Sequence, residues 1–282
     1  MKHCFMIMAH TQPKLLECLL KQIDFECNTI IIHIDKKKSI KDFITSFNAV
    51  KHAKLIILKK RKKCFWGTLS LVKVEYLLFK EALKHDFEYC HLLSGQTLLI
   101  KSFKELNDFI EINKNKQYID INEENCDLEI RNKIGFFHLF KNKFPFEKGY
   151  KFNKKLRSKS ISIQNRLHIN RIKDLKNFKK GSQWFSSNKK FLEYVVLNKR
   201  KILKRYKYTS CADEIFIPTL YYNSNFYNEN NYGLTYTDWS EHKFSPKTLE
   251  ICDFDKIKNS NKFFARKFSL EHIDLVNKIL ES

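Results

Sequence analysis

The chain has 282 residues, enough to bury the core of one large α/β domain. Its 53 Lys and Arg exceed its 31 Asp and Glu, and the formal net charge of +22 indicates anionic partners. The eight cysteines include no C-x-x-C pair and no adjacent cluster of histidines, which excludes a zinc site of ordinary spacing and favours buried thiols in a reducing cytoplasm.

Alternating apolar segments in the first hundred residues predict strands and helices in turn. Strands are expected at residues 3–9, 28–34, 55–58 and 89–93. Helices are expected from Pro13, which Thr11 and Gln12 precede, and over residues 69–85. Strand, helix and strand in succession predict a parallel sheet and an α/β nucleotide-binding half.

Nothing in the sequence predicts a segment that crosses a membrane. The apolar run at residues 3–9 is too short for a signal peptide, and no later segment offers about 18 uncharged apolar residues. We expect a cytoplasmic protein, with peripheral contact at the inner face of the membrane.

Polar residues follow three of the predicted strands. Ligands of such sheets bind beyond the carboxyl ends of the strands, so His10, Asp35 and the Ser94-Gly95-Gln96 segment are expected on one rim. The Asp35 carboxylate could accept hydrogen bonds from a uracil or a ribose, or it could simply end the strand. The sequence contains neither G-x-G-x-x-G nor a P-loop, which argues against dehydrogenases and P-loop kinases.

Trp66, Gly67 and Thr68 precede the second predicted helix. A glycine here permits close backbone approach, and the indole could pack on a ligand or belong to the core.

A strongly basic segment occupies residues 141–180. It holds 14 Lys and Arg against two acidic residues, Glu147 and Asp174. This composition predicts a helix with a loop that contacts anionic lipid or a lipid-linked phosphate acceptor, or else a solvated linker. Nucleic acid is disfavoured because no zinc-finger spacing, RNP-type aromatic sequence or helix-turn-helix accompanies the charge.

Two carboxylates, Asp213 and Glu214, stand at the start of an apolar segment, residues 211–220, that predicts a helix. They could cap that helix, because its N-terminus stabilises negative charge. Alternatively, one of them is the general base that an inverting sugar transfer requires.

Arg266 and Lys267 lie between phenylalanines in the segment 263–268. Such a pair could hold a diphosphate without a divalent ion, or it could be a solvated part of an amphipathic strand. The segment Asp253-Phe254-Asp255 has the D-x-D form of a metal site but follows no apolar strand, so we interpret it as a chance match and expect no metal.

Eight short motifs in order give the chain a resemblance to a known family. The chain resembles the core-2/I-branching β-1,6-N-acetylglucosaminyltransferase and peptide O-xylosyltransferase family, in particular its bacterial members. The motifs are Ile32 to Lys37, Trp66-Gly67, His91 to Gln96, Gly181 to Phe185, Asp213 to Phe216, Thr237-Asp238-Trp239, Ser245-Pro246-Lys247 and Phe263 to Phe268.

The resemblance implies a GT-A-like α/β fold, a UDP-sugar donor, inversion at the anomeric carbon and no metal cofactor. By correspondence, Glu214 is the catalytic base and Lys267 a cation on the donor diphosphate. The second diphosphate cation of animal members has no clear counterpart, and Lys247, Lys243 or Arg266 could substitute for it, with Lys247 and Arg266 equally favoured. The residues expected at the donor are His10, Asp35, Trp66, Lys247, Arg266 and Lys267. Those expected at the sugar and acceptor are Ser94, Gly95, Gln96, Gln183, Trp184 and Asp213.

One departure from the family is clear. The acidic residue that usually follows Ser-Gly-Gln is replaced by Thr97, so a contact with the sugar or acceptor is altered. We expect a single glycosyltransferase domain, with a nucleotide-binding half at residues 1–100 and an acceptor half at 101–282.

The expected reaction transfers a sugar, preferably N-acetylglucosamine, to a glycan or lipid-linked oligosaccharide in the synthesis of a bacterial surface polysaccharide or lipopolysaccharide. The alternatives are a non-catalytic basic protein that binds lipid or nucleic acid, and an inactive homologue that binds a UDP-sugar.

Overall fold

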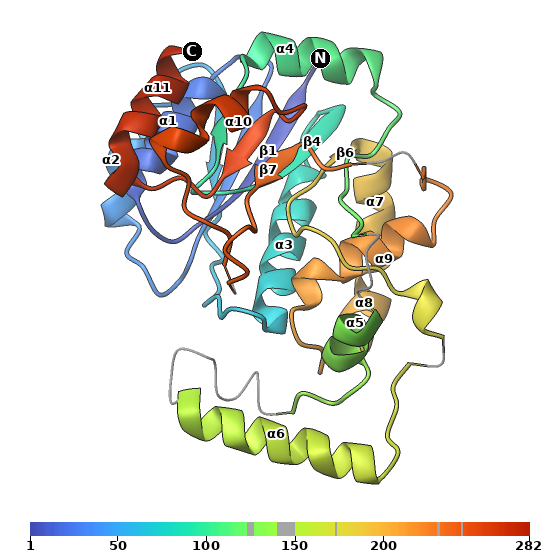
Figure 1. Cartoon of the computed structure of the whole chain (residues 1–282). Helices are drawn as coiled ribbons and strands as arrows, with labels where there is room; N and C mark the ends of the chain where they lie inside the picture. Colours follow the sequence, from blue (N-terminus) through green and yellow to red (C-terminus); the bar gives the residue numbers. More distant parts are fainter. Residues whose placement is uncertain (123–126, 140–149, 173, 230–231, 244) are drawn as a thin grey trace.

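The fold is taken from a computed structural model that describes residues 1–122, 127–139, 150–172, 174–229, 232–243 and 245–282, except the side chains of 150–154 (Figure 1). Residues 141–149 and 173 of the basic segment therefore lie outside the described part.

A central five-stranded sheet has the order β3-β2-β1-β4-β6. Its strands are β1 (His3–Ala9), β2 (Thr29–Ile34), β3 (Lys54–Ile57), β4 (Tyr89–Ser94) and β6 (Ser186–Asn188). The first four are parallel and β6 is antiparallel to β4. The four predicted strands and the mostly parallel α/β sheet are confirmed, whereas β6 was not predicted, because Ser186 and Ser187 carry no apolar signal.

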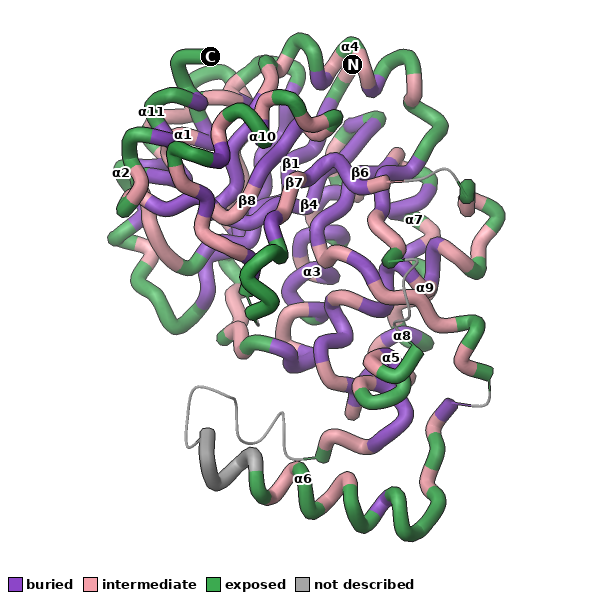
Figure 2. The backbone as a smooth tube through the Cα atoms, viewed as in Figure 1, coloured by how far each residue is buried: buried purple, intermediate pink, exposed green. Residues whose placement is uncertain are grey.

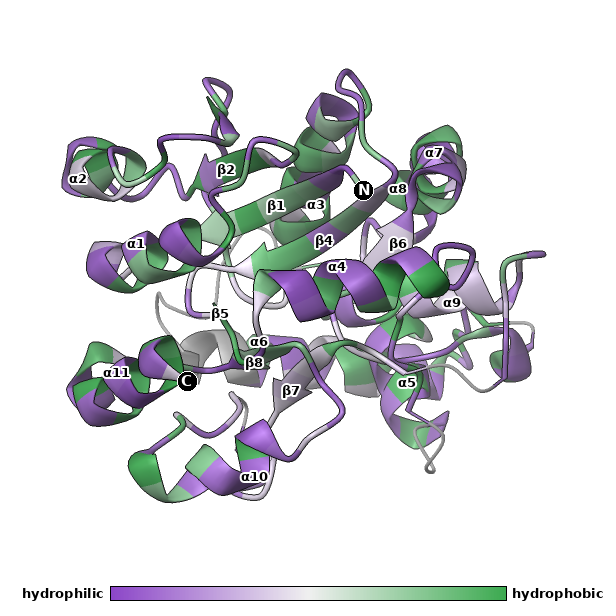
Figure 3. Cartoon of the chain, turned by 90° about the horizontal axis from the view of Figure 1, so that it is seen from above, coloured by the Kyte–Doolittle hydropathy of each residue, from purple (hydrophilic) through white to green (hydrophobic). Residues whose placement is uncertain are grey.

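Helices cover both faces of this sheet (Figure 3). Along β1, Cys4, Met6 and Met8 pack in the cluster that contains α3 (Leu69–Ala82). The alternate residues Phe5 and Ile7 pack in the cluster of α1 (Pro13–Gln22). A strand buried on both faces must be apolar throughout, which explains the uninterrupted hydrophobic runs of the sequence.

The other helices are shorter or lie at the periphery. Those that the structure describes are α2 (Ile44–Phe47), α4 (Phe103–Ile112), α5 (Asp127–Ile134), α6 (Tyr150–Arg166), α7 (Lys189–Leu197), α8 (Lys199–Arg205), α9 (Phe216–Tyr222), α10 (Phe254–Lys258) and α11 (Ile273–Glu281). Short 3₁₀ turns are η1 (Lys41–Phe43), η2 (Leu175–Asn177), η3 (Ala212–Glu214), η4 (Ile251–Asp253) and η5 (Leu270–His272).

A second, three-stranded sheet carries the C-terminal cations. Its order is β5-β8-β7, with β5 (Leu98–Leu99), β8 (Phe264–Arg266) and β7 (Thr235–Thr237). The Phe268 N–H donates to the Gln96 carbonyl oxygen at 3.1 Å, and the Gln96 side-chain amide donates to the Phe268 carbonyl oxygen at 3.2 Å. These bonds bring the end of β8 beside the end of β4.

Two local expectations need correction. The segment 211–220 does not form one continuous helix, because the turn η3 precedes α9. In a continuous helix Pro218 would leave the Glu214 carbonyl without its donor, whereas here that oxygen accepts the Gly181 N–H at 2.9 Å. Pro13 begins α1 as predicted, but the preceding Gln12 has φ of 51° and no side chain caps that helix.

The basic segment forms the helix α6, which confirms its helical part. Figure 2 shows α6 as largely exposed, and Lys155, Lys159 and Arg166 are among its exposed cations. Within the described part of the chain, no helix combines the length and the apolar character needed to cross a bilayer.

Buried histidines lie within the central sheet. His3 Nδ1 is 3.1 Å from His91 Nε2, and His91 Nδ1 is 2.8 Å from the Ser186 hydroxyl. His3 Nε2 is 3.2 Å from Asn107 Oδ1, an acceptor, so His3 donates there and accepts from His91 at its other nitrogen. His3 is neutral in this arrangement, because a further proton on its Nδ1 would face the N–H of His91 Nε2.

Burial lowers the pKa of His3 to about 4 and, at β2, that of His33 to about 4. His33 Nε2 accepts the Lys62 N–H at 3.0 Å. The unfolded chain binds protons at these rings below about pH 6.5, and the folded chain binds them only near pH 4. The contribution of these neutral rings to the free energy of unfolding is therefore complete above pH 6.5, and it falls as the pH decreases toward 4.

We predict that lowering the pH from 7 to 5 reduces the free energy of unfolding by about 2 kcal/mol for each of these histidines. Urea unfolding at both pH values measures the loss. His33→Gln retains an acceptor and should reduce the loss by one histidine's share, whereas His52→Gln, at an exposed histidine, should leave it unchanged. An equal loss in His33→Gln and the wild type would contradict the assignment.

Candidate active site

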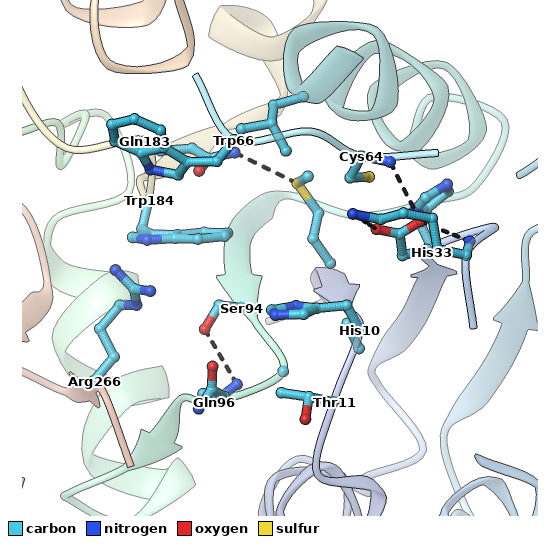
Figure 4. Close-up of a pocket in the computed structure, with 16 residues that line it drawn as sticks. His10, Thr11, His33, Cys64, Trp66, Ser94, Gln96, Gln183, Trp184 and Arg266 are labelled. Carbon is cyan, nitrogen blue, oxygen red and sulfur yellow. Dashed lines mark hydrogen bonds and ion pairs between the residues drawn. The ribbon is translucent and has the colours of Figure 1, made fainter. Parts of the chain in front are cut away.

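Two adjoining cavities lie at the carboxyl ends of β1, β2 and β4. The smaller has a volume of about 230 Å³ and the larger about 820 Å³. Seven residues line both cavities: His10, Trp66, Leu71, Gln96, Gln183, Trp184 and Arg266. The predicted rim of His10, Asp35 and Ser94 to Gln96 is thereby confirmed as one wall (Figure 4).

Asp35 belongs to the smaller cavity. Its Oδ1 accepts the backbone N–H of Lys37 at 2.9 Å and that of Cys64 at 3.3 Å, and Lys37 Nζ lies 3.7 Å from Oδ2. The Asp35 N–H donates to the Ala9 carbonyl at 2.9 Å. The carboxylate is therefore fixed between the ends of β1 and β2, where it can accept hydrogen bonds from a ligand.

The Ser94-Gly95-Gln96 turn lines the same cavity. A Cβ on Gly95 would lie 2.7 Å from the Ala9 Cβ, so the close approach of this turn to β1 requires glycine. Thr97, which replaces the family's acidic residue, is buried and lies 3.2 Å from the Ser94 hydroxyl, oxygen to oxygen. It lines neither cavity, so it supports the turn rather than a ligand.

Arg266 and Lys267 both line the larger cavity. The Arg266 guanidinium lies 5.0 Å from the ring centre of Trp184, and its Nε has no hydrogen-bond acceptor among the described residues (Figure 4). Burial lowers the pKa of Arg266 to about 10, and burial, followed by the charge of Arg266, lowers that of Lys267. Neither forms an ion pair with a carboxylate in the part of the chain that the structure describes.

Lys247 does not line the cavity that Arg266 and Lys267 line. Its Nζ donates to both carboxylate oxygens of Asp253, at 2.9 and 2.8 Å, and it lines neither cavity. Asp253, which belongs to the D-x-D segment and directly precedes α10, thus neutralises Lys247. Across the described ranges, no cluster of three His, Cys, Asp or Glu side chains could hold a metal ion.

Glu214 lines the larger cavity and joins a chain of four charges. Its Oε2 accepts a hydrogen bond from Lys133 Nζ at 2.6 Å, Lys133 also pairs with Glu129 at 2.8 Å, and Glu129 pairs with Lys180 at 2.8 Å. Burial opposes the charge of Lys133, but the charges of Glu214 and Cys211 and the hydrogen bonds to Glu129 and Glu214 together outweigh it and raise the pKa of Lys133.

Close backbone packing holds Glu214 in place. Gly181 donates its N–H to the Glu214 carbonyl, and a Cβ on Gly181 would collide with the Asp120 carbonyl oxygen. Asp120 also lines the larger cavity, accepts the Gly233 N–H at 2.6 Å, and has its pKa raised by burial.

The remaining predicted residues also lie at the cavities. Gln183 and Trp184 line both, and Asp213 is a buried residue of the larger one. Trp66 and Trp239 expose 40% and 51% of their surface, so they are available to stack on a ligand at the mouth of the larger cavity.

Sequence reasoning missed Asp120 and Lys262, which line the larger cavity, and the ion pairs of Lys133 and Glu129 behind Glu214. Glu129 and Lys133 have the i, i+4 spacing of a helical ion pair, but that spacing does not distinguish a surface pair from one at a cavity. Only the ion pair between Lys133 on α5 and Glu214 in η3 shows that this pair lies beside the cavity.

Comparison with known proteins identifies the family of the chain. Residues 4–259 match the family model of the core-2/I-branching enzyme. No curated protein matches the chain.

Two solved structures show distant likeness. Mouse xyloside xylosyltransferase 1 in its apo form has 8% sequence identity over 94% of this chain and 97% of its own, with a TM-score of 0.43. HddC from Yersinia pseudotuberculosis has 14% identity over 44% of this chain and 66% of its own, with a TM-score of 0.27. Because the family match extends over nearly the whole sequence, the chain belongs to the core-2/I-branching enzyme family and is a glycosyltransferase.

Proposed function

We propose that this glycosyltransferase moves a sugar from a UDP-sugar to a hydroxyl of a glycan acceptor with inversion at the anomeric carbon and without a metal ion. The observation that carries the proposal is the placement of Glu214 and the Arg266-Lys267 pair on one cavity that adjoins the cavity of Asp35. A carboxylate base and two cations without carboxylate partners are the charges that such a transfer requires.

The donor would extend across both cavities. Asp35 accepts hydrogen bonds from the uridine, with His10 and Trp66 beside it, and Arg266 and Lys267 bind the diphosphate. Arg266 is the second cation in this proposal, because Lys247 is neutralised by Asp253. We favour N-acetylglucosamine as the sugar by analogy with the family name alone.

Glu214 is the general base. Lys133 occupies its Oε2, and Oε1 receives no hydrogen bond from the described residues, so Oε1 is the oxygen that takes the acceptor proton. The acceptor oxygen forms a bond to C1 as the bond from C1 to the phosphate oxygen breaks, and the electron pair leaves with UDP. Arg266 and Lys267 stabilise the charge that develops on UDP, as a metal ion does in other enzymes.

The acceptor would enter the larger cavity, where Asp213, Trp184 and Trp239 lie with Glu214. A bacterial surface polysaccharide or lipopolysaccharide, including a lipid-linked oligosaccharide, is the acceptor class we propose.

We predict that Glu214→Gln abolishes sugar transfer and retains UDP binding, because the amide cannot take the acceptor proton. Release of UDP from UDP-linked N-acetylglucosamine, N-acetylgalactosamine, glucose, galactose and xylose, measured in EDTA, gives the activity and the donor. Calorimetry with UDP gives the binding.

Glu129→Gln is the matched control, because Glu129 contacts the same lysine but does not line either cavity. It should retain activity within about threefold, as expected for a partly exposed ion pair. Equal loss in the two variants would reject Glu214 as the base.

We predict that Lys267→Ala lowers turnover about 100-fold or more, the usual cost of removing one stabilising group from a transition state. Arg266→Ala should have a comparable effect, and Lys247→Ala should remain near wild type. Steady-state kinetics with the preferred donor measures all three. Wild-type turnover in Lys267→Ala would contradict its contact with the diphosphate, and a large loss in Lys247→Ala would make Lys247 the second cation.

We also propose that the basic segment contacts anionic lipid at the inner face of the membrane, because α6 presents exposed cations. The double variant Lys155→Glu, Lys159→Glu should weaken co-sedimentation with vesicles containing phosphatidylglycerol. The wild-type binding should decrease as salt is raised. The control is charge reversal at the exposed Lys73 and Lys80 of α3. An equal loss of vesicle binding in the control would mean that the net charge of the protein, rather than α6, determines the binding.

A further inference from the structure

A buried carboxyl group that the proposed reaction does not use lies behind the cavity wall. Glu75, on α3, has no exposed surface, and its neighbours Val74 and Tyr76 belong to a hydrophobic cluster. Burial, and then the nearby charge of Asp213, raise the pKa of Glu75 well above its usual range, which favours the neutral acid. Its Oε2 has no hydrogen-bond partner among the described residues. A buried carboxyl of this kind costs stability, so packing does not explain it.

Glu75 contacts one residue of the cavity wall directly. Gln183 Nε2 donates to Glu75 Oε1 at 2.7 Å, and the same nitrogen lies 3.6 Å from the Met8 sulfur (Figure 4 shows the second contact). A thioether sulfur only accepts hydrogen bonds, so the contact with Met8 requires the nitrogen of the Gln183 amide on this side. Glu75 then accepts the other N–H through its carbonyl oxygen Oε1, and the proton of the neutral acid is on Oε2.

The Gln183 amide is left with one unused group. Its two N–H bonds are directed at Glu75 and Met8, and Oε1 receives no hydrogen bond from the described part of the chain. Gln183 lines both cavities, so this oxygen is the polar atom that the side chain offers to a ligand.

The position of Gln183 identifies which part of the donor it meets. Asp35 lines only the smaller cavity, while Glu214 and Lys267 line only the larger. Gln183 lies on the wall that the two cavities share. In the proposed function, which this inference deepens, the transferred sugar occupies that boundary because C1 must face Glu214.

We propose that Glu75 is a positioning residue that fixes the Gln183 amide, so that its carbonyl oxygen accepts a hydrogen bond from a hydroxyl or amide N–H of the donor sugar. The site therefore selects sugars that carry such a donor at this position. It disfavours those that lack it, because the oxygen would then be left without a partner.

The test is a double-mutant cycle in the full chain, with UDP-N-acetylglucosamine and UDP as calorimetric ligands. Glu75→Leu and Gln183→Leu should each weaken binding of the sugar nucleotide about tenfold, the value of one hydrogen bond. Binding of UDP should be unchanged. The double variant should bind no more weakly than Gln183→Leu alone, because Glu75 acts only through Gln183.

Two further variants exclude a merely structural role. Glu75→Gln retains an accepting oxygen and should restore binding to within about threefold of wild type, a difference well below one hydrogen bond. Glu81→Leu, on the same helix but away from the cavities, should have no effect. The thermal midpoint of Glu75→Leu should not fall below that of the wild type, since the variant removes a buried polar group without a full set of partners.

Additive effects in the cycle, or equal weakening of UDP and the sugar nucleotide by Glu75→Leu, would overturn the inference. Wild-type affinity for the sugar nucleotide in both single variants would also overturn the inference. In that case the function proposed above would still stand. Failure of the wild type to bind either ligand would instead contradict the proposed function, and this inference with it.

Discussion

The pairing of β8 with β5 is the interaction on which the site depends. It joins Phe264 and Ala265 to Leu99 and Leu98, so a segment near the C-terminus completes cavities that are also lined by the ends of β1, β2 and β4 and by the segment around Gln183. The Ile100 N–H donates to the Phe263 carbonyl at 3.0 Å, which continues the ladder beyond the strands. Without these bonds, Arg266 and Lys267 would have no fixed relation to Asp35 or to the turn at Gly95.

The charges of the site differ in how they are neutralised. Glu214 is paired with Lys133, which orients its carboxylate, whereas Arg266 and Lys267 have no carboxylate partner among the described residues. Half-buried cations without partners are costly, and a bound diphosphate would remove that cost. In the proposed function, Glu214 is thus the base oriented before the acceptor binds, and the diphosphate is the anion that balances Arg266 and Lys267.

Elements whose signal is local were predicted correctly. The strands of the central sheet follow from uninterrupted apolar runs, and α3 follows from its helical periodicity after Thr68, whose side chain caps it. The rim of His10, Asp35 and Ser94 to Gln96 follows from the rule that parallel strands end at one edge of a sheet. The short strand β6 and the turn η3 were not predicted, and a strand at β8 was only one of two interpretations, because each is held by contacts with distant segments rather than by its own sequence.

The sequence by itself determined the α/β class, the family resemblance and the residue types that carry charge at the site. Only the tertiary structure decided which charges are available. It neutralises Lys247 with Asp253, gives Glu214 a lysine from α5, and places Glu75 behind Gln183. Pairing of charges depends on distances of a few ångströms between segments far apart in the chain, and neither spacing nor composition encodes those distances.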